Sequence, residues 1–325
     1  MKAAVYTRYG SPDVIEVTEV EKPTPKADEV LIKIRSASIN AYDWHLLRAK
    51  PFFTRALSGL FKPNNPILGA DISGVIESVG DAVTRWKPED KVYGCLESCG
   101  KGGLATGGFA EYVCAKESVL IAKPADMSFV EAAALPMAAV TALQGLRNDG
   151  KLKAGQHVLI NGASGGVGTF AVQIAKALGA EVTGVCSTAA VAVVRSLGAD
   201  HVIDYTREDF ADNGQRYDLI LDIAANRFVS DYRGSLKPEG RCVVIGFSDI
   251  SHLMNVSLFG GKSVTILMAD NTLGGDLASV NELFEAGKLK PVIDSYYPLD
   301  EVAAAINHVE TGHPKGKVII EITGS

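Results

Sequence analysis

The stretch LINGASGGVGTFAVQIAKALGA, residues 159–180, contains four glycines within seven residues and then continues into an apolar run with helical spacing. A glycine-rich turn between a strand and a helix lets the backbone approach a phosphate group. The first N–H groups of a helix have no acceptor within the helix and point outward. This stretch therefore predicts a strand, a tight turn and a helix that together bind a phosphate-bearing ligand.

The length and composition of the whole chain set broad limits. A chain of 325 residues favours two domains over one. Hydrophobic residues make up 47% and charged residues 22%, which argues against disorder and is enough for buried cores. The formal net charge of −6 gives no basic field for nucleic acid or anionic lipid. We therefore expect no nucleic-acid partner.

The start of the chain and its cysteines bear on the compartment. The first residues, MKAAVYTRYG, alternate like a strand and lack the apolar core of a signal peptide. The most apolar stretch, residues 130–146, contains Glu131, Pro136 and Gln144, and it predicts helix and loop rather than a membrane span. Five cysteines without a C-x-x-C motif fit reduced thiols. We expect a cytoplasmic protein without disulfides or integral membrane contact.

Two different patterns divide the chain. Residues 1–123 hold short alternating strands separated by prolines and glycines, which is typical of an antiparallel β-domain. From about Gln156, six β-branched runs (HVLIN, EVTGVC, HVIDY, DLILDIA, RCVVIG and KSVTILMA) alternate with helical runs, which predicts a doubly wound parallel sheet. After Met268 the rhythm ends, and the final strand KVIIEI is expected to return to the first domain. We predict an α/β fold with a β-domain over 1–123 and 269–325 and a Rossmann domain over 124–268.

The glycine-rich turn matches a dinucleotide-binding motif. Ala163, Gly165 and Gly168 occupy the three positions of G-x-G-x-x-G, with alanine in the first. Gly165 would let the backbone approach a pyrophosphate, and Gly168 would let the helix pack close to its strand. A tight turn without a ligand is the alternative. The predicted cofactor-binding residues here are Ala163, Ser164, Gly165, Gly166 and Val167, together with Gly246 and Phe247 after the fifth strand.

The end of the second strand bears on which dinucleotide binds. An NAD site usually has an Asp or Glu there, which accepts a hydrogen bond from the ribose 2′-hydroxyl. In this chain the strand ends with Val185, Cys186, Ser187 and Thr188. The missing acid permits a 2′-phosphate, and Ser187 or Thr188 could donate to it.

Taken together, several segments resemble the zinc-independent quinone oxidoreductase branch of the medium-chain dehydrogenase/reductase superfamily. They cover both predicted domains. The segments are SINAYDWHLLRA, ILGADISGVIESVG, GGFAEYV, EAAALPMAAVTALQGL, GASGGVGTFAVQIAKALGAEV, SLGADHVIDY and GHPKGKVII.

This resemblance implies a GroES-like substrate domain, a Rossmann domain, NADPH as the cofactor with NAD as the alternative, and commonly a homodimer. It also implies that Lys176 and Tyr205 hold the adenosine 2′-phosphate and that Thr141 contacts the nicotinamide. Close relatives usually have a basic residue just after the second strand, where this chain has Ala189 and Ala190. We therefore expect NADPH to bind only modestly better than NADH.

The same resemblance argues against zinc. Zinc alcohol dehydrogenases of the superfamily have a cysteine where this chain has Asn40, and G-H-E where it has Gly69, Ala70 and Asp71. Both replacements remove a ligand. The remaining Cys95 and Cys99 have an unmatched spacing, so no metal ligand is predicted.

A missing metal constrains the reaction. Reduction of a simple ketone puts charge on one oxygen, which zinc would stabilise as a Lewis acid. A quinone or an α,β-unsaturated carbonyl spreads that charge, so a hydrogen-bond donor can suffice. We predict metal-independent hydride transfer from NADPH to such an acceptor. The alternatives are an NAD(P)-dependent alcohol or carbonyl oxidoreductase, and a dinucleotide-dependent binding protein with little catalysis.

The candidate catalytic residues lie in NAYDWH. Asn40 can offer its amide N–H groups to a carbonyl oxygen or to the nicotinamide ribose. The resemblance places His45 at the position of a proton-relay histidine, and Tyr42 is a further candidate donor. Structural roles are the alternatives for Tyr42 and His45, and a structural role is expected for Asp43.

Two further features concern partners. The apolar stretch Pro51 to Phe61 predicts either a lid over a hydrophobic small-molecule substrate or ordinary core packing. The last Rossmann strand, KSVTILM from Lys262 to Met268, is β-branched and apolar at the edge of an open sheet. It predicts a homodimer paired through this edge.

Overall fold

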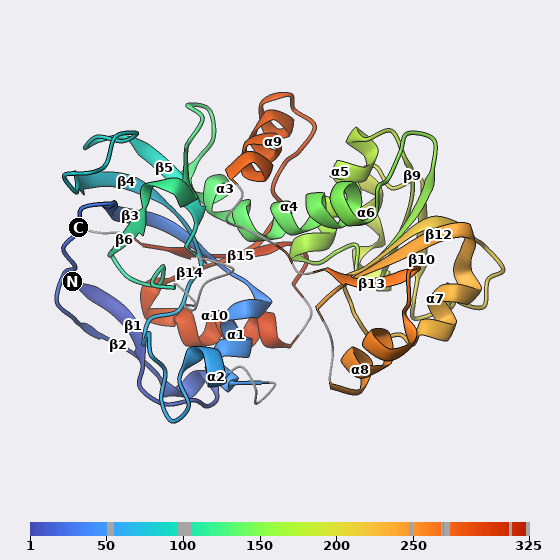
Figure 1. The fold of residues 1–325 in the computed structure, drawn as a ribbon, viewed down its shortest axis with the longest axis horizontal. Coiled ribbons are helices and arrows are strands. Elements are labelled where there is room, and N and C mark those ends of the chain that lie inside the picture. The colour runs from blue at the N-terminus through green and yellow to red at the C-terminus, as the bar shows by residue number, and fades with distance from the viewer. Residues whose placement is uncertain are drawn as a thin grey trace. The chain divides into compact units, whose positions relative to one another are not determined.

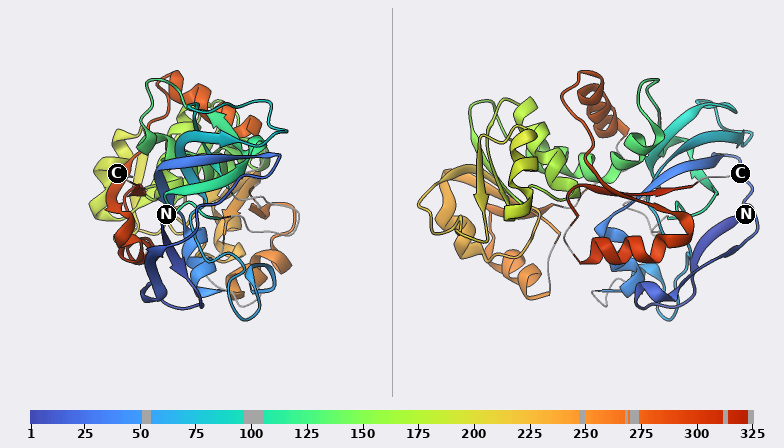
Figure 2. Two further views of the ribbon diagram at one scale, coloured as in Figure 1. Left: turned by 90° about the vertical axis from the view of Figure 1, so that its left-hand side faces the viewer. Right: turned by 180° about the vertical axis from the view of Figure 1, so that it is seen from behind.

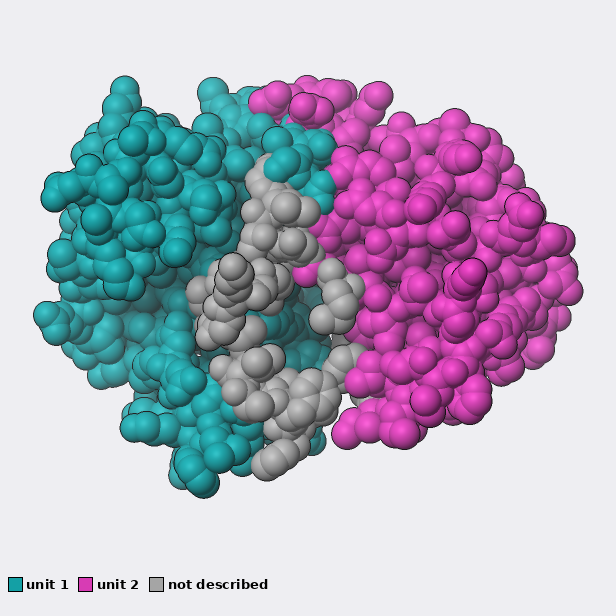
Figure 3. Space-filling view, viewed as in Figure 1, with its two compact units in different colours: residues 1–137, 270–281, 293–325 teal, residues 138–269, 282–292 magenta. Residues whose placement is uncertain are grey.

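The computed structural model describes residues 1–50, 55–96, 106–246, 250–267, 269, 274–311 and 314–322. The chain divides into two compact units, one of residues 1–137, 270–281 and 293–325 and the other of 138–269 and 282–292 (Figure 3). This division differs from the expected boundaries at three places. Residues 124–137 join the first unit, because α3 (Phe129–Ala134) packs on its sheet, and Ala269 and residues 282–292 join the second.

The second unit is built on the predicted parallel sheet. Its six strands follow the order β10-β9-β8-β11-β12-β13, all neighbours being parallel. This is the 3-2-1-4-5-6 order of dinucleotide-binding folds, and each of the six predicted runs forms one strand. The strands are β8 (His157–Asn161), β9 (Glu181–Cys186), β10 (His201–Asp204), β11 (Tyr217–Asp222), β12 (Leu236–Ile245) and β13 (Val264–Leu267).

Helices cover both faces of this sheet. In Figure 1, α5 and α6 lie on one face, and α7 and α8 lie on the other. The crossover helices follow from the parallel strand order, because parallel neighbours need a connection that returns over the sheet. The helices are α4 (Pro136–Leu143), which begins in the first unit and continues as a π-helical turn (Gln144–Asp149), α5 (Gly166–Ala177), α6 (Val191–Ser196) after the 3-10 turn Thr188–Ala190, α7 (Val229–Ser235) and α8 (Ile250–Phe259).

The first unit contains a mainly antiparallel sheet. Its order is β14-β15-β3-β4-β5-β7, with β6 also pairing with β3, and only β14 and β15 run parallel. β15 pairs with β3, so the last strand returns to the first unit as predicted. The strands are β3 (Glu29–Ile39), β4 (Asp71–Val79), β5 (Lys91–Cys95), β6 (Tyr112–Lys116), β7 (Leu120–Ala122), β14 (Ile293–Pro298) and β15 (Lys317–Glu321), and β1 (Lys2–Tyr6) pairs with β2 (Ile15–Glu19).

Helices and an apolar core complete the first unit. The reverse view in Figure 2 shows α10 (Val302–Glu310) against α1 (Ala41–Arg48). Leu47 of α1 and Ile306 of α10 are fully buried, together with Ile32 and Ile72 of the sheet. The remaining helices are α2 (Arg55–Ser58), α9 (Gly274–Glu285), which ends in the second unit, and the 3-10 turns Pro12–Val14, Glu117–Val119 and Leu299–Glu301.

The apolar stretch that follows α1 is described only in part. Leu60 is 56% exposed and Phe61 is 89% exposed, so these two side chains are not core residues. Phe52, Phe53 and the side chain of Leu57 lie outside the described residues. The lid therefore stays a prediction. In the described part of the chain, no helix is long and apolar enough to cross a membrane.

Candidate functional site: a phosphate-binding turn and a buried Asn-Asp-Lys cluster

The glycine-rich turn connects β8 to α5. Gly162 has a φ of +88°, a conformation that favours glycine, and the N–H groups of Gly162 and Ala163 donate to the Val185 carbonyl (3.2 and 3.0 Å). These bonds fasten the turn to β9. The helix begins at Gly166, and its first N–H groups have no acceptor within the helix. Residues 164–167 are partly exposed, so a ligand can reach them.

The fold requires glycine at position 168 of this turn but not at position 165. A Cβ on Gly168 would lie 2.0 Å from the Gly162 carbonyl oxygen, so only glycine fits between helix and strand. A Cβ on Gly165 would meet only that same oxygen, at 3.7 Å, and the φ of Gly165 is an ordinary −78°. Neither backbone conformation nor packing requires glycine at position 165. The missing side chain leaves room for a ligand beside the helix N-terminus, and the turn therefore fits a dinucleotide pyrophosphate.

Three of the other predicted cofactor residues lie at the same edge of the sheet. Ser187, Tyr205 and Gly246 follow β9, β10 and β12, and the carboxyl ends of parallel strands share one edge. Thr141 is buried on α4. Phe247 lies outside the described residues.

Lys176 is at the opposite edge, which corrects the expectation that it holds the 2′-phosphate. Its ammonium contacts the Asp200 carboxylate at 2.7 and 2.9 Å and the Ala180 carbonyl at 3.1 Å. Ala180 and Asp200 come just before β9 and β10, whereas Ser187 and Tyr205 follow those strands. A six-residue strand such as β9 is about 20 Å long, so Lys176 does not reach them.

An acid that the sequence reasoning missed lies beside Thr188. Asp204, the last residue of β10, accepts hydrogen bonds from the Thr188 hydroxyl (2.6 Å), the Thr206 hydroxyl (2.7 Å) and the Thr206 N–H (3.0 Å). The Thr188 bond, followed by those from Thr206, holds the pKa of Asp204 below its usual value. The Thr188 hydroxyl proton is therefore already donated, and a negative charge stands where a 2′-phosphate was expected.

A second missed acid lies where the strand order reverses. Asp222 at the end of β11 is fully buried and accepts from the Asn161 amide (2.9 Å), the Ala225 N–H (2.9 Å) and the Tyr232 hydroxyl. Burial raises the pKa of Asp222, and these donors oppose that rise. Asn161 ends β8, so Asp222 ties the two central strands together at the point where open α/β sheets bind ligands.

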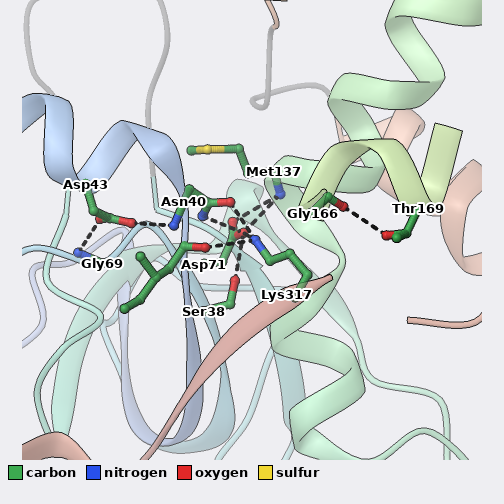
Figure 4. Close-up of polar contacts among 10 residues, drawn as sticks. Ser38, Asn40, Asp43, Gly69, Asp71, Met137, Gly166, Thr169 and Lys317 are labelled. Atoms are coloured by element: carbon green, nitrogen blue, oxygen red, sulfur yellow. Dashed lines mark hydrogen bonds and ion pairs between the residues drawn. The ribbon is translucent and has the colours of Figure 1, made fainter. Parts of the chain in front are cut away.

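The first unit contains a buried polar cluster around Asn40 (Figure 4). Asn40 precedes α1 as its N-cap, a position where the side chain ordinarily accepts a helix N–H. Here its Oδ1 instead accepts from the Lys317 ammonium at 2.6 Å, and its Nδ2 donates to Asp71 Oδ2 at 3.0 Å. One hydrogen on Nδ2 remains, and it has no acceptor among the described residues.

Asp71 receives donors from several elements. Its carboxylate accepts from the Ser38 hydroxyl (3.3 Å) and the Met137 N–H (3.1 Å), and Lys317 Nζ lies 3.8 Å away. Asp71 and Lys317 are both buried. Burial raises the pKa of Asp71 and lowers the pKa of Lys317, and the attraction between the two opposes each shift. Neither residue was predicted to take part in the site.

Asp43 holds the backbone beside this cluster. Its carboxylate accepts from the Asn40 N–H (2.8 Å) and the Gly69 N–H (2.9 Å). Burial raises the pKa of Asp43 to about 7, against the effect of these two N–H donors. Asp43 thus joins the start of α1 to the loop before β4, which is a structural role.

The two other candidate proton donors have structural contacts of their own. His45 Nδ1 donates to the Lys50 carbonyl (2.9 Å), and its ring stacks on Trp44 with centroids 3.6 Å apart. Burial lowers the pKa of His45. Tyr42 is partly buried and packs against the apolar core. Their roles as proton donors stay predictions.

The residues of this cluster do not fit a zinc ion. An amide at Asn40 and a methyl group at Ala70 are not zinc ligands. Of the two carboxylates beside them, Asp71 faces the Lys317 ammonium, and Asp43 accepts from two backbone N–H groups. A second cation there would be repelled. Within the described ranges, no group of three or more His, Cys, Asp and Glu residues could hold a metal. Cys95 is buried on β5, and Cys99 lies outside those ranges.

Comparisons with known proteins agree with this fold. Residues 26–125 match the model of the alcohol dehydrogenase GroES-like domain, and residues 197–320 match that of the zinc-binding dehydrogenase family. A 2-methylene-furan-3-one reductase of Solanum lycopersicum is 36% identical over 331 residues, covering 98% of this chain and 79% of the relative. An NADPH-dependent alkenal/one oxidoreductase of Arabidopsis thaliana is 34% identical over 339 residues, with coverage of 98% and 79%.

A solved structure covers nearly the whole chain. The quinone oxidoreductase of Coxiella burnetii has a TM-score of 0.89 and 30% sequence identity, and the match covers 99% of both chains. The GroES-like family model and this structure agree with the pair of folds that the sequence predicted, a GroES-like domain and a Rossmann domain. The chain therefore belongs to the medium-chain dehydrogenase/reductase superfamily, among its quinone oxidoreductases and enone reductases.

Proposed function

We propose that this protein is a metal-independent reductase that transfers hydride from NADPH to the conjugated system of a quinone or an α,β-unsaturated carbonyl. The observation that carries the proposal is the Asn40 amide, which is fixed between Lys317 and Asp71 and keeps one N–H group for a ligand. The names of the relatives, which act on enones, alkenals and quinones, support the same substrate class.

Besides binding the cofactor and the substrate, the protein needs to supply little more than a hydrogen-bond donor in a fixed position. A bound dinucleotide supplies the hydride, and the turn of residues 162–167 would hold its pyrophosphate. Hydride addition to an enone or quinone leaves negative charge spread over an enolate or phenolate oxygen. The remaining Asn40 N–H would donate to that oxygen, and a proton then completes the reduction. Charge spread in this way needs no Lewis acid.

The choice between the two dinucleotides is expected to be weak. Asp204 places a carboxylate beside Thr188, and Lys176 is held at the other edge of the sheet. Ser187 and Tyr205 are the remaining groups that could meet a 2′-phosphate. We therefore expect NADPH to bind better than NADH by less than about tenfold, which is below the roughly 10- to 150-fold that a charge-assisted contact gives.

A screen of acceptors tests the proposed function. EDTA-treated protein is incubated with NADPH or NADH and with quinones, enones, alkenals, simple ketones and aldehydes, and cofactor oxidation is followed by absorbance. We expect turnover with the conjugated acceptors and little with the simple carbonyls. No oxidation with any conjugated acceptor would contradict the proposal. So would activity that disappears in EDTA and returns with zinc, or tighter binding of NADH.

We also propose a homodimer that pairs through β13. This strand is an edge of the parallel sheet, and the exposed side chains of Ile250, Met254 and Leu258 lie on α8, which leads into it. An open edge and an exposed apolar face both tend to be covered. Cys242 N–H donates to the Ser263 carbonyl, so by alternation the backbone groups of Ile266 face away from β12.

Ile266→Pro is therefore expected to give a folded monomer. Proline removes an N–H that points to the open edge and donates no hydrogen bond to β12. Light scattering at micromolar concentration measures the mass, and Ile266→Val serves as the matched variant that should stay dimeric. A wild-type monomer, or an Ile266→Pro dimer with wild-type melting temperature, would show that this edge is not the interface.

A further inference from the structure

Lys317 is a buried ammonium whose shortest hydrogen bond goes to a neutral amide. It is 2% exposed, and its Nζ lies 2.6 Å from Asn40 Oδ1 and 3.3 Å from the Ile39 carbonyl, but 3.8 Å from the Asp71 carboxylate. A buried ammonium usually pairs directly with a carboxylate. Here Asn40 stands between the two charges, with its oxygen toward the cation and its nitrogen toward the anion.

This arrangement determines which way the Asn40 amide points. The reverse orientation would put the NH₂ group against the Lys317 ammonium and the oxygen against the Asp71 carboxylate, which repel them. The two charges therefore fix the amide in one orientation. The remaining N–H on Nδ2 then has a fixed direction as well, because the amide group is planar.

The same contact strengthens the donor. A hydrogen bond to an amide oxygen draws electron density from the nitrogen, and hydrogen bonds polarise one another in a buried network of low dielectric constant. The N–H groups of Asn40 thus become better donors than those of an ordinary side-chain amide. The cluster thus holds a positive charge in contact with the donor, at a place where the described residues do not fit zinc.

We propose that Lys317 is a positioning residue, which orients and polarises the Asn40 amide so that its free N–H stabilises the oxygen of the reduced substrate. This inference rests on the proposed function, because it assigns the origin of the donor strength at the same site. Asp71 is the counterpart that anchors the other N–H. Lys317 itself touches neither substrate nor cofactor in this assignment.

The proposed role of Lys317 predicts a particular pH dependence of kcat. Lys317 faces Asp71 on β4, Asp43 on α1 and Cys95 on β5, and the pKa of its ammonium is lowered by burial against the attraction of these groups. Loss of the proton at alkaline pH removes the polarising charge. In the wild type, kcat should therefore fall as pH rises through a pKa below the ordinary lysine value of 10.5.

Lys317→Met tests the proposal, because it keeps the length of the side chain and removes the charge. We expect kcat to fall by about 10- to 100-fold, with the NADPH dissociation constant unchanged and the alkaline fall in kcat absent. Lys315→Met makes the same chemical change at an exposed position two residues earlier and should leave all three measurements unchanged.

The single variant leaves Asp71 without its buried partner, so stability needs its own control. The double variant Lys317→Met with Asp71→Asn removes both charges, and it should recover the melting temperature but not kcat or the alkaline limb. A double variant with wild-type kcat and pH profile would overturn the inference. If the wild-type protein itself reduces no conjugated acceptor, the proposed function fails. If the wild type is active and the Lys317 variants have the same kcat and pH profile, the inference alone fails.

Discussion

Asn40→Ala is expected to lower kcat by about 10²- to 10³-fold, the usual cost of removing one preorganised donor from a developing oxyanion. The helix start should survive, because the bond from the Asn40 N–H to Asp43 is made by the backbone. Lys317 and Asp71, already 3.8 Å apart, can close into a direct ion pair where the amide stood. The dissociation constant for NADPH should stay within about threefold of wild type, since the predicted pyrophosphate turn lies in the second unit.

Ser73→Ala is the matched control for this loss. Ser73 is also a buried polar residue of β4, and its hydroxyl donates to the Phe129 carbonyl at 2.6 Å, outside the Asn40 cluster. Its replacement should lower the melting temperature by a few degrees and leave kcat near wild type. Steady-state kinetics and thermal unfolding of both variants separate lost chemistry from lost stability. An Asn40→Ala enzyme with wild-type kcat would remove Asn40 from the mechanism.

The fold could be predicted largely from local patterns. The local sequence predicts the six strands of the second unit and the turn at Gly162, and each run of β-branched residues forms one strand. α8 is harder to recognise in the sequence, because its apolar residues lie on two sides. Val256 is buried, while Met254 and Leu258 are exposed, so the run has no single apolar face.

The site was harder to predict, because it depends on register between distant segments. β15 pairs with β3 so that Val318 lies opposite Ile39, and this register brings Lys317 beside Asn40, 277 residues away in the sequence. Nothing near either residue in the sequence indicates the other. In the same way, Asp204 was overlooked because an acid was sought only at the end of β9, although β10 lies directly next to it.

Lys176 shows how a motif can mislead when its geometry is left out. The residue lies near the end of α5, a helix of 12 residues and hence about 18 Å long. The N-terminus of that helix is at the carboxyl edge of the sheet, so its last turn is necessarily at the amino edge. Counting the rise along the helix would have excluded a shared site with Ser187 and Tyr205.

Gly168→Ala is expected to be the most destabilising single change in the turn. The new methyl group would lie 2.0 Å from the Gly162 carbonyl oxygen and 2.7 Å from the Ala163 carbonyl carbon, both of them backbone atoms. No side chain can rotate to relieve these contacts, so α5 must move away from β8. We expect the free energy of unfolding to fall by about 3 kcal/mol or more, or the second unit to fail to fold.

Gly165→Ala is the informative counterpart, because the fold has room for its methyl group. The nearest atom would be 3.7 Å away and the backbone conformation is ordinary, so the melting temperature should stay within about 2 °C of wild type. The methyl group would instead occupy the space through which a pyrophosphate approaches the N-terminus of α5. We expect the NADPH dissociation constant, measured by cofactor fluorescence, to rise by about 10- to 100-fold. Unchanged NADPH binding by a stable Gly165→Ala protein would mean that this turn shapes the fold and does not hold the cofactor.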